Sequence, residues 1–118
     1  LDSSINLVWC RHALEHSPYP LFTLIEFNRV LADGGHLYVE VPAPNCERMH
    51  EGNPNHFSVL GDRMWVSLFG RAGFLLTDYR QLNFDVQLDG NNMKENFYCF
   101  VLKKIKTLPC NQLSPAQS

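Results

Sequence analysis

The order of its sequence patterns predicts that this chain has an α/β fold with a mostly parallel sheet. Apolar runs typical of strands alternate with segments of helical periodicity, as in right-handed βαβ units. The last two apolar runs are separated by a tight turn, so the final strand should be antiparallel to its predecessor. With 45% hydrophobic and 12% aromatic residues, the 118-residue chain can form one folded core.

The first strand is predicted over residues 5–10, where the sequence INLVWC is largely apolar. Polar residues follow it at once, beginning with Arg11 and His12. An apolar run that ends in polar side chains is typical of a buried parallel strand whose carboxyl end faces a ligand crevice.

A helix is predicted over residues 17–32, with Ser17 as its N-cap and Pro18 at the first position, where a missing N–H group is tolerated. The segment Asp33–Gly35 should end this helix, because glycine adopts the left-handed conformation of a C-cap. Residues 36–41 (HLYVEV) alternate between core-facing and outward positions and predict the second strand.

The rest of the chain predicts a loop, a helix and a hairpin. Residues from about 43 to 60 are polar and contain several Gly, Pro and Asn residues, which indicates a long, lid-like loop. Residues 62–72 predict the second helix. Residues 74–86 and 97–105 predict two strands around a turn that contains Asp89 and Gly90.

Composition excludes several classes of protein. The net charge is −2 and no basic run occurs, so a nucleic-acid-binding surface is not expected. No apolar stretch approaches the ~18 residues of a membrane span. The four cysteines lack paired spacing, which disfavours a disulfide framework or a zinc ribbon and favours free thiols in the cytoplasm. Because the first residue is Leu1, we expect the chain to be part of a longer protein.

Residues 12–16 contain the pattern H-x-x-E-H, which is found in some zinc enzymes. In that interpretation His12 and His16 would bind the ion and Glu15 would be a general base. A catalytic zinc site needs a third protein ligand and a helix long enough to hold the geometry. The sequence SPYP at residues 17–20 ends any such helix immediately, so no metal site is predicted.

Four segments of the chain carry a resemblance to a known family: INLVWCRHALEH, LIEFNRVLADGGHLYVEVP, NHFSVLGDRMWVSLFGRAGF and the hairpin ending in FYCFVLKK. Together they resemble the C-terminal half of class I S-adenosylmethionine-dependent methyltransferases, in particular the small-molecule enzymes related to the ubiquinone and menaquinone methyltransferases. The second segment is the most specific. Asn6 departs from the pattern, since members commonly carry an acidic residue there.

The resemblance implies a partial Rossmann-like sheet. The family's strand order is 3-2-1-4-5-7-6, and this chain should contribute strands 4-5-7-6 with helices packed on them. Residues 1–106 would form the C-terminal half of the domain, followed by a polar tail at 107–118. Without strands 1 to 3, the strand at Ile5–Cys10 has a free edge, so we expect it to pair with a missing N-terminal portion or with a second copy in a homodimer.

The resemblance also implies methyl transfer from S-adenosylmethionine to a small molecule. In the family, a glycine-rich turn and an acidic residue in the N-terminal half hold most of the cofactor. This chain has no G-x-G turn, and Gly34–Gly35 lies at a predicted helix end. We therefore expect the chain alone to be inactive. The alternative is a non-catalytic remnant that serves as an assembly or binding module.

The implied site lies at the end of the first strand. Cys10 and Arg11 would contact the cofactor, and His12 would be the catalytic residue, as a substrate contact or a proton acceptor. The substrate side would be formed by Glu15, His16, Pro42, Asn45 and His56. Structural roles remain open for these residues, since the histidines could hydrogen-bond the loop, Glu15 could cap the next helix and the loop residues could be solvated.

Overall fold

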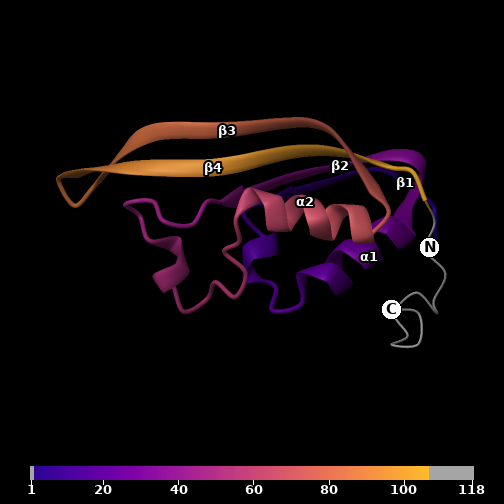
Figure 1. Cartoon of the computed structure of the whole chain (residues 1–118), viewed down its shortest axis with the longest axis horizontal. Coiled ribbons are helices and arrows are strands. Elements are labelled where there is room, and N and C mark those ends of the chain that lie inside the picture. The colour runs from indigo at the N-terminus through magenta and orange to yellow at the C-terminus, as the bar shows by residue number, and fades with distance from the viewer. Residues whose placement is uncertain (1, 107–118) are drawn as a thin grey trace.

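The computed structural model describes residues 2–106, which form a four-stranded sheet with helices on one face (Figure 1). The predicted tail at 107–118 lies outside the described residues. In chain order the elements are β1 (Ile5–Arg11), the helical turn η1 (Leu14–His16), α1 (Pro20–Val30), β2 (Leu31–Pro42), the helical turn η2 (His50–Gly52), α2 (Asp62–Arg71), β3 (Phe74–Leu88) and β4 (Asn91–Lys104). No helix among residues 2–106 is long and apolar enough to cross a membrane.

The strand order in the sheet is β1-β2-β4-β3. β1 is parallel to β2, while β4 is antiparallel to both of its neighbours, β2 and β3. In the order of the implied family this is 4-5-7-6 with the last strand antiparallel, so the predicted fold class is confirmed.

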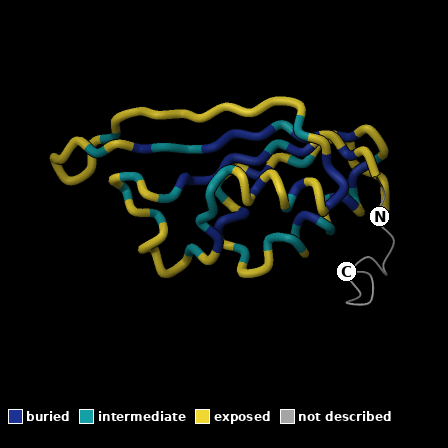
Figure 2. Tube along the Cα trace, viewed as in Figure 1, coloured by how far each residue is buried: buried dark blue, intermediate teal, exposed yellow. Residues whose placement is uncertain are grey.

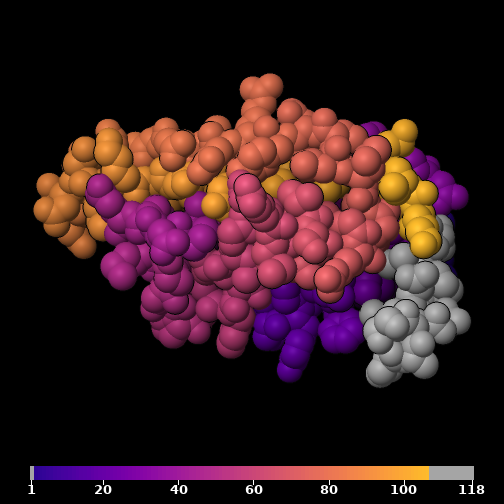
Figure 3. Space-filling model, viewed as in Figure 1, coloured from indigo at the N-terminus to yellow at the C-terminus, as the bar shows by residue number. Residues whose placement is uncertain are grey.

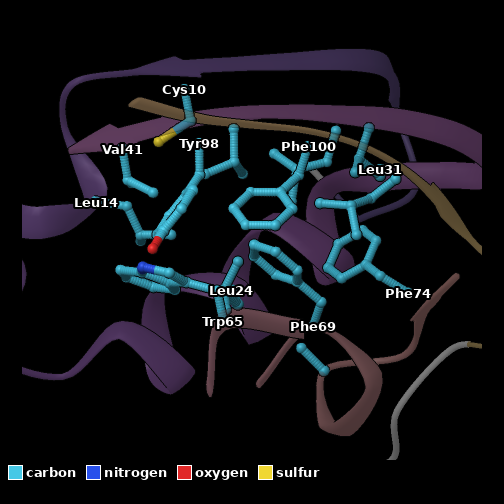
Figure 4. Close-up of a cluster of buried hydrophobic side chains, with 14 of the residues drawn as sticks. Cys10, Leu14, Leu24, Leu31, Val41, Trp65, Phe69, Phe74, Tyr98 and Phe100 are labelled. Carbon is cyan, nitrogen blue, oxygen red and sulfur yellow. The ribbon is translucent and has the colours of Figure 1, made fainter. Parts of the chain in front are cut away.

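The core lies between the sheet and the two helices, which cover the same face (Figure 1). Strand alternation directs Leu37, Val39 and Val41 of β2 toward the helices, and all three are fully buried. Aromatic rings of α2 and β4 meet in this layer, where Phe69 and Phe100 pack edge to face with centroids 4.9 Å apart (Figure 4).

The prediction that β1 is buried was wrong for most of the strand. Only Cys10 is buried, whereas Ile5, Leu7 and Trp9 are exposed, Trp9 to 63%. These three side chains alternate onto the sheet face that carries no helix among the described residues. Trp9 stacks there on Tyr38, with ring centroids 4.1 Å apart. Within residues 2–106, β1 pairs with β2 alone, so its outer edge is free, as expected.

The start of α1 also differs from its prediction. The helix begins at Pro20 with Tyr19 as N-cap, rather than at Pro18 with Ser17 as N-cap. Both prolines are compatible with a first turn, so sequence alone favours neither. Ser17 instead stabilises the turn that precedes the helix, because its Oγ accepts a hydrogen bond from the Tyr19 N–H at 3.2 Å.

The end of α1 has no glycine C-cap, which corrects a second expectation. The chain passes from Val30 directly into extended backbone at Leu31. Gly34 has a φ of +76° and lies in an irregular segment of β2 where the register with β1 shifts. Gly35 is required by close approach, since a Cβ there would lie 3.2 Å from the Asn6 carbonyl oxygen of β1 and 2.8 Å from that of Ala32.

The β3–β4 hairpin is longer than predicted and gives the molecule its extents of 50 × 29 × 23 Å. Its register continues without a break from Asp78 to the pair of Leu88 and Asn91, so β4 begins well before residue 97. β3 is exposed along most of its length (Figure 2).

A buried polar network joins both helices to β4. Lys104 is 2% exposed, and its Nζ donates to the main-chain carbonyls of Asn28 at 2.7 Å and Leu31 at 2.6 Å. The Asn28 side chain in turn donates to the carbonyls of Ala72 and Lys106, both at 2.8 Å. The network therefore fixes the end of α1 against the end of α2 and the last strand.

Replacing Lys104 with methionine should lower the free energy of unfolding by about 2 kcal/mol, because two buried carbonyls lose their donor. Urea denaturation followed by circular dichroism would measure the change. Lys103→Met is a matched control at an exposed position of the same strand, and its effect should stay within about 0.5 kcal/mol. Equal destabilisation by the two variants would contradict this account of the network.

Candidate functional site

A cleft of about 370 Å³ opens at the carboxyl ends of β1 and β2. Ligands of open α/β sheets bind at this end of the strands. The walls come from β1, η1, the loop at 43–60 and β4. The residues that line the cleft are Arg11, His12, Glu15, His16, Pro42, Arg48, His50, Asn53, His56, Glu95 and Phe97.

The cleft brings together the predicted site residues except Cys10 and Asn45. The Cys10 thiol points into the core beside Leu14 (Figure 4), and burial, with a smaller contribution from the Glu15 charge, raises its pKa to about 11. Cys10 can therefore reach the cleft only through its main chain. Asn45 adopts a left-handed φ of 63°, and its N–H donates to the Glu51 carboxylate at 2.8 Å. The roles proposed for these residues stay predictions.

Glu40 organises one side of the cleft, and sequence reasoning did not select it. Its buried carboxylate accepts a hydrogen bond from the Tyr38 hydroxyl at 2.9 Å, forms an ion pair with Arg11 Nε at 2.9 Å and contacts His12 Nε2 at 2.5 Å. Burial acts to raise the pKa of this carboxyl, but the Tyr38 hydroxyl and the charges of His12 and Arg11 outweigh it, so the pKa lies below its usual value. The sequence signal that could have identified Glu40 was its outward position near the end of a predicted strand.

His12 is held firmly in an unusual conformation. Its φ is 52°, in the left-handed region that residues other than glycine rarely adopt, and its N–H donates to the Glu40 carbonyl at 2.8 Å. The ring packs edge-on against Phe97, with centroids 4.4 Å apart. Because the Glu40 carboxylate contacts Nε2, Nδ1 faces Glu15, 4.0 Å from Oε2. A carboxylate that orients an imidazole in this way prepares its other nitrogen to accept a proton.

A second buried carboxylate, Glu95 of β4, also lines the cleft. It is 2% exposed and accepts from Arg48 Nη1 at 3.0 Å and contacts His50 Nε2 at 2.5 Å. Loop residues therefore lie against the hairpin, as Figure 3 shows for the magenta loop beneath the orange strands. Sequence reasoning missed Glu95 because it precedes the strand predicted at 97–105, and without Glu95 nothing singled out Arg48 and His50 within the loop.

The loop at 43–60 is anchored to η1 by main-chain hydrogen bonds. The N–H groups of Phe57 and Ser58 donate to the Glu15 carbonyl at 2.9 and 3.0 Å, and the Ser58 hydroxyl donates to the Ser17 carbonyl at 2.7 Å. These bonds bring His56 beside His16, with ring centroids 4.8 Å apart. This end of the predicted lid is therefore tied to the segment that follows β1.

Comparisons with known proteins agree with this geometry. Residues 1–87 match the model of a methyltransferase domain family. Among solved structures, the YcgJ protein of Bacillus subtilis is similar, with a TM-score of 0.75, 16% identity and coverage of 89% of this chain and 66% of that one. A SAM-dependent methyltransferase from Archaeoglobus fulgidus has a TM-score of 0.64 and 14% identity, covering 87% of this chain and 61% of that one.

A third similar structure is the arsenic(III) S-adenosylmethionine methyltransferase of Chlamydomonas reinhardtii, with a TM-score of 0.57 and 26% identity. The match covers 89% of this chain but 38% of that protein. This chain thus spans 66% or less of the length of all three neighbours. No curated protein matches the chain.

In Glu40→Gln the free energy of unfolding should decrease less than in the wild type when the pH is lowered. Because the pKa of the folded-state carboxyl lies below its reference value of 4.5, the ionised form stabilises the fold above that pH, and this stabilisation is lost as the pH falls through the folded-state pKa. The free energy of unfolding, measured from about pH 7 to pH 3, should fall less steeply in the variant.

Glu26→Gln is the matched control, since Glu26 also has a lowered pKa, caused mainly by Arg29, but its carboxylate is exposed. Solvent screens that ion pair, so its removal should change the pH dependence less. Identical profiles for wild type and Glu40→Gln would contradict the stabilising role of the buried carboxylate.

Proposed function

Because the chain belongs to this methyltransferase domain family, we propose that it forms the C-terminal half of an enzyme that transfers a methyl group from S-adenosylmethionine to a small molecule. The observation that carries the proposal is the polar cleft at the carboxyl ends of β1 and β2, in a chain that matches the family over residues 1–87. That end of an open α/β sheet is where ligands bind.

The roles of the side chains follow from the chemistry of the transfer. S-adenosylmethionine, when bound, would supply a methyl group on a sulfonium, which the substrate nucleophile would displace, leaving the electron pair of the broken carbon–sulfur bond on sulfur. Most of the catalysis comes from alignment of the reacting atoms. In this proposal Arg11 and the main chain of Cys10 contact the cofactor, while His12 accepts the substrate proton at Nδ1 with Glu40 orienting its ring.

The substrate side of the proposed cleft lies between η1 and the loop at 43–60. It would be formed by Glu15, His16, Pro42, Asn45 and His56. In this proposal residues 1–106 form the C-terminal half of the domain, and the loop at 43–60 closes over the bound small molecule. The protein would act in the cytoplasm. Support for an additional N-terminal portion comes from the coverage of 66% of the YcgJ structure and from the sheet face without helices.

Titration calorimetry with S-adenosylmethionine tests the proposal. The 118-residue chain should show no measurable binding, because it has no glycine-rich turn to approach the cofactor. A longer chain, extended with the sequence encoded upstream of Leu1, should bind. If the extended chain contains such a turn and still fails to bind, the non-catalytic alternative, an assembly or binding module, replaces the proposed function.

The free edge of β1 should make the isolated chain associate. Its apolar side chains Leu7 and Trp9 are exposed beside the unpaired strand edge, and such edges pair with other chains. Sedimentation equilibrium should therefore give dimers or larger species, and Leu7→Lys should shift them toward monomer. Leu75→Lys is a matched control on β3, at the other edge, with similar exposure. A stable, folded wild-type monomer would contradict the pairing role of β1.

A further inference from the structure

Three potential metal ligands meet on the η1 side of the cleft. A carboxylate oxygen of Glu15 and one ring nitrogen each of His16 and His56 lie within 4.8 Å of one another. Glu15 and His16 come from η1, and His56 comes from the loop that is hydrogen-bonded to the Glu15 carbonyl. The anchored loop therefore holds the three side chains in one place.

The hydrogen bonds of the two imidazoles define which nitrogen is available. His16 Nδ1 lies 2.8 Å from the Asn55 carbonyl oxygen, and His56 Nδ1 lies 2.7 Å from the His50 carbonyl oxygen. A carbonyl oxygen can only accept, so each Nδ1 must carry the proton and donate. Each Nε2 then keeps its lone pair. Metal-binding histidines are typically oriented by this kind of donation from the second ring nitrogen to a carbonyl.

Glu15 supplies an independent indication of a missing partner. Its side chain is buried, with a relative exposure of 2%, and Oε1 has no hydrogen-bond partner among the described residues. A buried carboxylate oxygen without a partner is unfavourable. His12 Nδ1 lies 4.0 Å from Oε2 and is beyond hydrogen-bond distance. The cluster thus presents a buried carboxylate and two Nε2 lone pairs. All of these atoms are electron-pair donors, and none of them can donate a hydrogen bond to another.

We propose that Glu15, His16 and His56 bind a divalent transition-metal ion, with its remaining coordination positions open to the cleft. Two imidazoles and one carboxylate suit zinc, cobalt or iron better than magnesium or calcium, which prefer oxygen ligands. The site differs from the zinc motif rejected on sequence grounds. His12 is oriented toward Glu40, and the third ligand comes from a distant loop rather than from a helix.

A neighbouring group of side chains, Cys46, His50 and Glu95, is less suited to a cation. Its ligand atoms also lie within 4.8 Å of one another. However, both Glu95 oxygens already have partners, Arg48 at Oε2 and His50 at Oε1. The Arg48 guanidinium would repel a metal ion there.

Calorimetric titration of the metal-free 118-residue chain with Zn²⁺ tests the site directly. We expect one ion per chain, and Co²⁺ should give visible absorption bands with nitrogen and oxygen ligation. Glu15→Gln and His56→Ala should each weaken Zn²⁺ binding by at least about tenfold, since even the loss of an outer-shell partner of a ligand costs that much. Zn²⁺ should raise the melting temperature of the wild type and not of these variants.

Two histidine variants are matched controls. His36→Ala changes an exposed histidine of β2 that lies outside the cleft lining, and His50→Ala removes the imidazole of the neighbouring group while keeping the carbonyl that accepts from His56. Both should bind Zn²⁺ as the wild type does. Circular dichroism establishes whether each variant is folded. If His56→Ala does not fold, the test rests on Glu15→Gln, which keeps the size of the side chain.

The absence of Zn²⁺ and Co²⁺ binding to the wild type would overturn the proposal, as would unchanged affinity in both ligand variants. Loss of binding in His50→Ala with retention in His56→Ala would move the ion to the neighbouring group and equally refute the assignment. These measurements need neither S-adenosylmethionine nor a methyl acceptor, so the metal site and the proposed methyl transfer can fail independently.

Discussion

Both helices of the described chain pack on the same face of the sheet, and the remaining features follow from this constraint. A parallel sheet is normally covered on both faces. Here the apolar alternation of β2 and β4 fills one layer with Leu37, Val39 and Phe100, while Trp9 and Tyr38 stack on the uncovered face. The free edge of β1 belongs to the same open side of the architecture.

Two buried carboxylates near the cleft, Glu40 close to the end of β2 and Glu15 in η1, differ in their partners. Glu40 is fully engaged by Tyr38, Arg11 and His12, so it orients an imidazole and keeps its own charge. Glu15 has an oxygen without a partner among the described residues, so it remains available to an ion or ligand. The cleft thus combines a positioned imidazole, that of His12, with a carboxylate that has an unpartnered oxygen among the described residues, and main-chain hydrogen bonds hold the segments that carry both.

Sequence patterns predicted the fold more fully than the site. Hydrophobic periodicity and turn residues were sufficient for the order of helices and strands along the chain, while the strand order in the sheet came from the family resemblance. Alternation within β1 could not indicate which sheet face lacks a helix, and so the burial of Trp9 was predicted wrongly. At the start of α1, Pro18 and Pro20 both suit a first turn. The proximity of His56 to Glu15 depends on main-chain hydrogen bonds of the loop, which no side-chain pattern reports. Glu95 was missed because β4 extends beyond its apolar segment.

The length of the β3–β4 hairpin has a consequence for local motion. From Arg80 to Lys94 neither strand is covered by a helix, and most side chains there face solvent. Opening of the hairpin from its tip would release little buried apolar surface and need not disturb the core. At Glu95, contacts with Arg48 and His50 add a buried anchor. Amide-proton exchange along the hairpin would therefore be graded, fast at Asp89–Gly90 and slow from Glu95 onward. The contacts of Glu95 would separate a tip that opens locally from the part of the hairpin that stays closed.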